Sequence, residues 1–158
     1  MRVFLGTDHA GFELKEHLVS WLKANGHEAV DCGAFAYDAV DDYPPFVLRA
    51  AERTAAEPGS LGIVIGGSGN GEAIAANKVR GVRAALVWNE DTARLAREHN
   101  DANVISIGAR QHDPATATRF VQLFLETPYS DEARHTRRIE MLSAYERTGD
   151  LPPLPDQG

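Results

Sequence analysis

The sequence contains little cysteine and little positive charge, and each shortage excludes a class of protein. Cys32 is the only cysteine in 158 residues, so an internal disulfide is excluded and a reducing compartment is expected. The 16 lysines and arginines face 23 acidic residues, which gives a formal net charge of −7 and a pI of about 5.3. Because a chain this acidic is repelled by a phosphate backbone, nucleic acid is not expected as a partner.

Long apolar stretches and metal-binding motifs are also lacking. No apolar run is long enough to span a bilayer, so no membrane association is expected. The opening residues, 1–6, are too short for the apolar part of a signal peptide and lead directly into a predicted strand, which favours the cytoplasm. The histidines show neither His-x-His nor His-Glu-x-x-His spacing, so the sequence predicts no metal and no other cofactor.

The composition that remains, 43% apolar and 25% charged, is that of an ordinary globular domain. We expect one domain over residues 1–150 and an extended tail over 151–158, which holds three prolines. Within the domain, short apolar runs alternate with segments of helical periodicity. The predicted strands are 2–7, 27–32, 61–65, 82–88 and 103–107, and the predicted helices are 11–25, 46–57, 72–78, 89–98, 114–127 and 131–147. This alternation predicts an α/β fold, a doubly wound (Rossmann-like) five-stranded parallel sheet with helices on both faces.

The most informative stretch is a glycine-rich loop between the third strand and the next helix. It reads Gly66-Gly67-Ser68-Gly69-Asn70-Gly71-Glu72. Glycines let backbone N–H groups approach an anion closely, and strand–loop–helix is the layout that aims them at one. No lysine follows at P-loop spacing, and Glu72 stands where a dinucleotide fingerprint needs glycine. The loop therefore predicts a small phosphorylated ligand, with a ligand-free tight turn as the alternative.

Other polar side chains also follow predicted strands, at the edge where ligands bind in such sheets. Asp8 and His9 follow the first strand, and Arg110 follows the fifth. His99 and Asn100 are different, because they precede the fifth strand and belong by default to the opposite edge. They reach the ligand only if the helix before them ends beside the glycine loop.

Each of these side chains also has an ordinary structural explanation. Asp8 can cap the first helix, His9 can be a hydrogen-bonded loop histidine, and Glu72 is favoured by the dipole of a first helical turn. The others are residue types that helix ends and solvated helix faces commonly carry: His99, Asn100, Arg134 and Arg138.

Six motifs occur in order from Val3 to about Arg147. They are Asp8-His9-Ala10-Gly11, Asp42-Tyr43-Pro44, Gly67-Ser68-Gly69-Asn70-Gly71-Glu72, Ala75-Ala76-Asn77-Lys78, His99-Asn100-Asp101-Ala102-Asn103-Val104 and Arg134-His135-x-x-Arg138. Together they resemble the type B ribose-5-phosphate isomerases, which share their fold with galactose-6-phosphate isomerase subunits. The resemblance implies interconversion of ribose 5-phosphate and ribulose 5-phosphate in the pentose phosphate pathway. It also implies a metal-independent homodimer or dimer of dimers.

The resemblance further implies a role for the loop glutamate. Many members carry a cysteine base two residues before the serine or threonine of the loop, but this chain has Gly66 there. It resembles instead the branch in which a glutamate is the base, here Glu72. One carboxylate can move a proton between C2 and C1. Ser68 and the N–H groups of the loop, from Gly67, Gly69, Asn70 and Gly71, can stabilise the enediolate.

The remaining roles also come from the resemblance. It implies that Arg134 and Arg138 hold the phosphate in the site of the neighbouring subunit, where forked guanidinium donors match a dianion. His9 and Arg110 assist at the phosphate end. The final group acts on the sugar: His99 as proton donor in opening the furanose ring, and Asp8 and Asn100 as ligands of sugar oxygens.

Two other functions fit the same residues. One is an isomerase of another phosphosugar, such as a six-carbon aldose phosphate. The second is a non-catalytic phosphosugar-binding module, which binds its ligand without turnover and gives no reason for Glu72 beside the glycine loop.

Overall fold

One parallel sheet forms the centre of the protein. In the computed structural model, which describes residues 1–156, five strands pair in the order β2-β1-β3-β5-β4. The strands are β1 (Arg2–Thr7), β2 (Glu28–Asp31), β3 (Leu61–Gly66), β4 (Ala84–Val87) and β5 (Val104–Gly108). All four neighbouring pairs are parallel, which confirms the predicted doubly wound sheet. The chain reverses its direction of winding between β1 and β3, so their carboxyl ends form the switch point where ligands bind.

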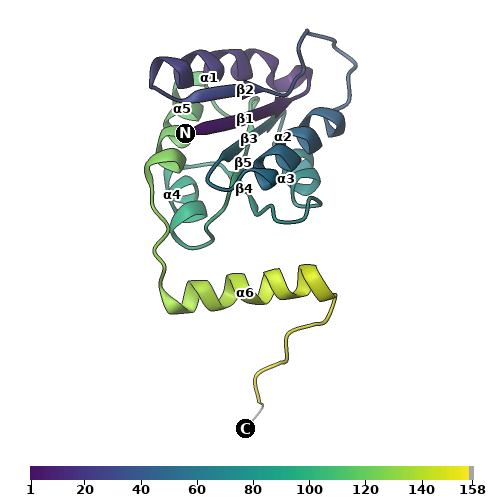
Figure 1. The fold of residues 1–158 in the computed structure, drawn as a ribbon. Helices are drawn as coiled ribbons and strands as arrows, with labels where there is room; N and C mark the ends of the chain where they lie inside the picture. Colours follow the sequence, from purple (N-terminus) through teal and green to yellow (C-terminus); the bar gives the residue numbers. More distant parts are fainter. Residues whose placement is uncertain (157–158) are drawn as a thin grey trace.

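Helices cover both faces of this sheet (Figure 1). A short 3-10 turn, η1 (His9–Gly11), precedes the six α-helices α1 (Phe12–Ala24), α2 (Pro44–Ala56), α3 (Asn70–Ala76), α4 (Glu90–Glu98), α5 (Pro114–Glu126) and α6 (Ala133–Thr148). Buried side chains of α1, α4 and α5 share one apolar cluster with Ile63 and Ile65 of β3. Those of α2 and α3 share the opposite cluster with Val64. Neighbouring residues of β3 therefore belong to different clusters, because successive side chains of a strand point to opposite faces of the sheet.

The observed boundaries agree with the predicted ones to within about two residues, as expected for frayed ends. Asn89 caps α4 as predicted, with its side chain accepting from Thr92 N at 2.8 Å. The change that affects the candidate site concerns α3, which begins at Asn70 rather than at Glu72 and so shortens the glycine loop. Residues 151–156 have no regular secondary structure, and the last two residues of the predicted tail, 157–158, lie outside the described part. Within residues 1–156, none of the helices is long and apolar enough to cross a membrane.

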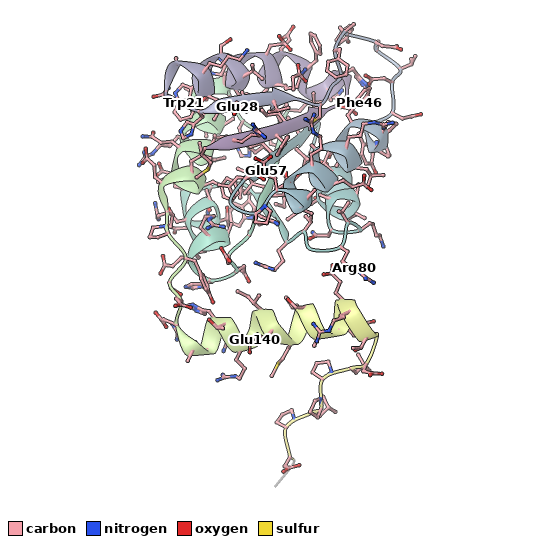
Figure 2. All side chains as sticks on the ribbon, viewed as in Figure 1. Trp21, Glu28, Phe46, Glu57, Arg80 and Glu140 are labelled. Carbon is pink, nitrogen blue, oxygen red and sulfur yellow. The ribbon has the colours of Figure 1, made fainter. Side chains whose placement is uncertain are left out.

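Helix α6 lies outside both layers (Figure 1) and contacts the domain through a hydrogen bond from Gly81 N to Glu146 Oε2 at 3.1 Å. His135 is its only buried residue, while Met141, Leu142 and Tyr145 are exposed. The preceding segment is tied to α4 by a hydrogen bond from Ser130 N to Glu98 O at 3.1 Å. Arg80, in the turn after α3, lies on the side of the domain that faces α6 (Figure 2). A helix with large apolar side chains in solvent is one that another surface can cover.

Lys15 provides a stability test, because its side chain extends from α1 and is fully buried. Its ammonium donates to Asp31 Oδ2 at 2.7 Å and to Ala34 O at 2.6 Å, where the chain leaves β2. Lys15→Met keeps the apolar stem but leaves both acceptors unpaired, so we expect a loss of about 2–3 kcal/mol, below the full cost of a broken buried pair. Urea unfolding measures this, with exposed Lys23→Met in the same helix as control. If Lys15→Met and Lys23→Met had the same free energy of unfolding, the hydrogen bonds of the Lys15 ammonium would not contribute to stability.

Candidate active site

Four segments meet at the carboxyl edge of the sheet. They are the turn after β1, the loop 33–43, the glycine loop after β3, and the turn after β5. The last two are joined directly, since Ala109 N donates to Gly66 O at 2.7 Å and Arg110 N donates to Gly67 O at 3.1 Å. This backbone pairing continues the β3–β5 ladder beyond the strands and fixes Arg110 next to the loop.

The glycines of the loop make room for side chains. A Cβ on Gly66 would collide with the carboxylate of Glu72, and a Cβ on Gly71 would lie 2.6 Å from the hydroxyl of Tyr43. Gly69 has a φ of +86°, in the left-handed region that glycine adopts without strain. Its carbonyl accepts from Ser106 Oγ at 2.7 Å, which holds the loop from the sheet side. The loop is thus shaped so that the Glu72 carboxylate folds back over the end of β3.

Glu72 is buried, with 4% of its surface exposed. Burial is the main cause that raises the pKa of its carboxyl above the ordinary value, and the nearby negative charge of Asp8 raises it further. A carboxylate that is poorly solvated is a stronger base than one in water. Such a group is suited to accepting a proton from a carbon acid.

Asp8 and His9 lie on the other side of this edge. Asp8 Oδ1 accepts from Ala10 N at 2.9 Å, so Asp8 caps the 3-10 turn η1 and not the first α-helix, whose N-cap is Gly11. His9 is bound to Asp41, whose Oδ1 lies 2.8 Å from His9 N and 2.7 Å from His9 Nδ1. The hydrogen bond to Asp41 is the main cause that raises the pKa of His9, against the opposing effect of burial.

Asp8, His9 and Asp41 also form the one group in residues 1–156 whose oxygen and nitrogen atoms are close enough for a shared cation, all within 4.8 Å. However, His9 Nδ1 and Asp41 Oδ1 are already bonded to each other. A cation would have to break this bond to use either atom. The arrangement is therefore a histidine–carboxylate pair, and we assign no metal to it.

Arg110 and the two polar loop residues face solvent at this edge. Nη1 of Arg110 lies 2.9 Å from where a Cβ of Gly67 would stand, so the guanidinium covers the loop. Ser68 and Asn70 are exposed, and the Ser68 hydroxyl accepts from Asn70 N at 3.2 Å. The hydroxyl proton of Ser68 remains free to point toward a ligand oxygen.

His99 and Asn100 lie at the opposite edge of the sheet. They end α4, and the chain then enters β5 through Asn103, whose carbonyl accepts from Gly62 N at the start of β3. The strand β5 between the two edges spans about 15 Å. The condition for His99 and Asn100 to reach the glycine loop of the same chain is not met, because α4 runs antiparallel to the strands it connects and ends at the start of β5.

The amino edge carries a second group of candidate residues. His99 stacks on His135 with ring centroids 4.2 Å apart, and Ser130 Oγ lies 2.8 Å from His135 Nδ1. Burial lowers the pKa of His135, and the charge of His99 lowers it further. Arg134 and Arg138 begin the same helix and are exposed. One chain thus holds two separate groups, a carboxyl-edge group and an amino-edge group.

Sequence reasoning missed three side chains in these groups. Asp41 lies in an irregular loop with several acids, where the sequence does not show which one faces His9. Tyr43 and His135 stood in quoted motifs without a role. The one signal for His135 is that a buried histidine needs a polar partner, which Ser130, five residues earlier, supplies.

A substitution at Gly66 tests whether the position of the Glu72 carboxylate matters. Gly66→Ala brings a methyl group into the space that this carboxylate occupies, and the carboxylate can move aside because it ends a flexible side chain. We expect kcat to fall roughly 10- to 100-fold, with the fold retained, because small misplacements of a reacting group are costly. In a Glu72→Gln background the same change should add little, and an additive loss would argue against this mechanism.

The carboxyl-edge group combines the buried Glu72 carboxylate, hydroxyl and N–H donors, and the side chains of His9 and Arg110. This set suits proton abstraction next to a carbonyl on a small phosphorylated molecule.

Comparisons with known proteins agree with this chemistry. The family model described as Ribose/Galactose Isomerase matches residues 3–142. Ribose-5-phosphate isomerase B of Mycobacterium tuberculosis is 60% identical over 155 residues, 98% of this chain and 96% of the relative. Ribose-5-phosphate isomerase B from Mycoplasma genitalium, solved with bound ribulose-5-phosphate, has a TM-score of 0.89 at 39% identity and covers 93% of this chain and 97% of that one.

A third similarity is to type B ribose 5-phosphate isomerase from Trypanosoma cruzi, with a TM-score of 0.88 and 42% identity over 94% of this chain and 99% of that one. The family match over residues 3–142 and the relative at 60% identity together show that this protein belongs to the ribose/galactose isomerase family, among its type B ribose-5-phosphate isomerases.

Proposed function

We propose that this protein interconverts ribose 5-phosphate and ribulose 5-phosphate, a reaction of the pentose phosphate pathway, through an enediolate and without a metal. The observation that carries the proposal is the buried Glu72 carboxylate, held over Gly66 beside the glycine loop. Identity of 60% along nearly the whole chain to a ribose-5-phosphate isomerase B supports the substrate. We place the reaction in the cytoplasm, which fits a single unpaired cysteine.

In this proposal Glu72 takes the proton from C2 and returns it to C1. Ser68 and the N–H groups of the loop, from Gly67 to Gly71, stabilise the charge that develops on the enediolate oxygens. Asp8, whose second oxygen is not used in capping, binds a sugar hydroxyl. The loop position of Gly66 leaves no thiol to compete with Glu72, since Cys32 is buried elsewhere and contacts Arg53.

The phosphate and ring-opening groups come from a second subunit. His99, Asn100, Arg134 and Arg138 belong to the amino-edge group, which cannot meet the glycine loop of its own chain. A two-fold axis can bring the amino-edge group of one chain to the carboxyl-edge group of another, and the exchange is then reciprocal. The exposed apolar residues of α6, Met141, Leu142 and Tyr145, fit such an interface. We therefore propose a homodimer, alone or paired into a tetramer, with two shared sites.

Within each shared site we assign the partner's side chains as follows. His99 donates a proton to the ring oxygen of the furanose, and Asn100 binds a sugar oxygen. Arg134 and Arg138 are four residues apart, so they project from one face of α6 and can hold the phosphate together. His9 and Arg110 complete the phosphate site from the carboxyl edge.

A coupled assay distinguishes this function from its alternatives. We expect ribose 5-phosphate to be converted with a kcat/KM well above that for a six-carbon aldose phosphate, and a chelator to leave the rate unchanged. A higher kcat/KM for the six-carbon substrate would favour the other isomerase. Binding of ribose 5-phosphate without turnover would favour a non-catalytic module, and loss of activity with chelator would overturn the metal-independent mechanism.

A further inference from the structure

We propose that Asp41 is a positioning residue that holds His9 as an imidazolium, with Nε2–H directed at the phosphate group of the substrate. The inference rests on the proposed function for the identity of the phosphate ligand. The pairing of Asp41 with His9 is independent of it. Asp41 itself touches no reacting atom in this account and acts only through the histidine.

The hydrogen bonds fix the orientation of the ring and place a proton on Nδ1. Asp41 Oδ1 accepts from the backbone N of His9 at 2.8 Å and faces its Nδ1 at 2.7 Å. Because a carboxylate accepts and cannot donate, Nδ1 carries a proton. Nε2 is therefore the ring nitrogen left for a ligand. It donates a hydrogen bond only when it also carries a proton, which makes the ring an imidazolium.

Burial of the carboxylate favours the charged ring. The Asp41 side chain is 11% exposed, and its Oδ2 is the buried carboxylate oxygen without a hydrogen-bond partner in residues 1–156. A carboxylate with one unpaired oxygen is costly to bury unless a positive charge lies next to it. The charged groups that face His9 are Asp41 and Asp8, which raise its pKa, and Arg110, which lowers it; the neutral ring of Tyr37 packs edge-on.

The placement of Arg110 indicates what the charged ring faces. Its guanidinium covers Gly67 of the glycine loop and is close enough to His9 to oppose its protonation. Two neighbouring cations that repel each other are both stabilised when a dianion binds between them. Asp41 keeps His9 in the charged form while that space is still empty, so the phosphate meets a site that is already prepared.

The test follows the titration of His9 and phosphate binding in Asp41→Asn. The asparagine oxygen can still accept both hydrogen bonds, so the geometry is kept and only the charge is removed. In the wild-type protein we expect His9, followed by NMR, to titrate above the ordinary histidine range. In the variant its midpoint should fall, and Kd for inorganic phosphate and KM for ribose 5-phosphate should rise while kcat changes little.

The pH dependence identifies the mechanism. As pH rises, the variant loses its imidazolium before the wild type does. The ratio of variant to wild-type Kd should be near one at about pH 6 and reach roughly five- to tenfold near pH 8, since charged hydrogen bonds are about twice as strong as neutral ones. Titration of the phosphate itself is common to both proteins and cancels in this ratio. A ratio that does not vary with pH would indicate a merely structural role and overturn the proposal.

Two controls complete the design. Asp38→Asn removes the same charge from an exposed position of the same loop, where the side chain accepts only from Val40 N, and should leave the ratio at one. In a His9→Asn background, Asp41→Asn should have no further effect on phosphate binding. If Asp41→Asn fails to fold, a wild-type His9 that titrates at or below the ordinary value still overturns the proposal.

The outcomes separate this inference from the proposed function. If the protein turns over ribose 5-phosphate but Asp41→Asn leaves the titration midpoint of His9 unchanged, the proposed function stands and the inference about Asp41 is wrong. If the protein has no isomerase activity but Asp41→Asn weakens inorganic phosphate binding in a pH-dependent manner, the proposed function is wrong and the inference about Asp41 stands.

Discussion

Glu72→Gln should lower kcat for ribose 5-phosphate by at least ~100-fold, the lower end of what a general base contributes. The amide has nearly the shape of the carboxylate and can occupy the same space over Gly66, but it cannot accept a proton. Because Glu72 is not among the groups proposed to hold the phosphate, KM should change little. Steady-state kinetics with a coupled assay for ribulose 5-phosphate measures both constants, and a near-normal kcat would show that Glu72 is not the base.

The pH profile gives a second measurement of the same group. Burial raises the pKa of Glu72, and the base must be ionised to act. Activity should therefore decline on the acid side at a higher pH than an ordinary carboxyl would give, and this limb should be absent from the residual activity of Glu72→Gln. An acid limb that persists unchanged in the variant would belong to a different group.

Cys32 serves as the control for the alternative base. Its thiol is buried, and burial is the main cause that raises its pKa, so it is a poor thiolate at neutral pH. Cys32→Ser should leave kcat nearly unchanged, and alkylating reagents should not abolish turnover. Loss of activity on alkylation of a folded protein would return a cysteine to the mechanism.

The sequence was sufficient for the fold because each level of pattern indicated the same structure. The β-branched run before the glycine loop predicted a strand buried on both faces, and β3 is buried along its whole length. Carboxyl ends of parallel strands share one edge, which brought Asp8, His9, Glu72 and Arg110 together without any knowledge of contacts.

The parts of the site that could not be predicted lie in irregular segments, whose apolar residues show no helical or strand periodicity. Asp41 lies in the loop 33–43, and its partner is 32 residues away in sequence. Turn chemistry does not encode that pairing, because it arises only when the loop packs against η1. The proposal that His99 acts in the site of a partner chain could not come from the sequence pattern either, since a pattern within one chain contains no information about a second copy.

Helix α6 and the amino-edge group make the assembly testable by mixing two inactive proteins. Arg138→Ala removes a proposed phosphate ligand, and Glu72→Gln removes the proposed base, so each variant alone should be nearly inactive. If the sites are shared across a two-fold axis, a mixed dimer has one site with both defects and one with neither. Random reassociation makes half of the dimers mixed, so roughly a quarter of all sites should recover full activity by this symmetry.

The control is a mixture of two variants whose substitutions both lie in the amino-edge group. His99 and Arg138 lie in the same amino-edge group, and so a mixed dimer of His99→Asn with Arg138→Ala leaves one defect in each site. That mixture should show no recovery, whereas His99→Asn with Glu72→Gln should recover about as well as the first pair, because their residues come from opposite edges. Subunit exchange is confirmed separately with differently tagged chains. Exchange without recovery in either cross-edge mixture would mean that each chain builds its site alone, and the observed separation of His99 from the glycine loop would then require a different route to ring opening.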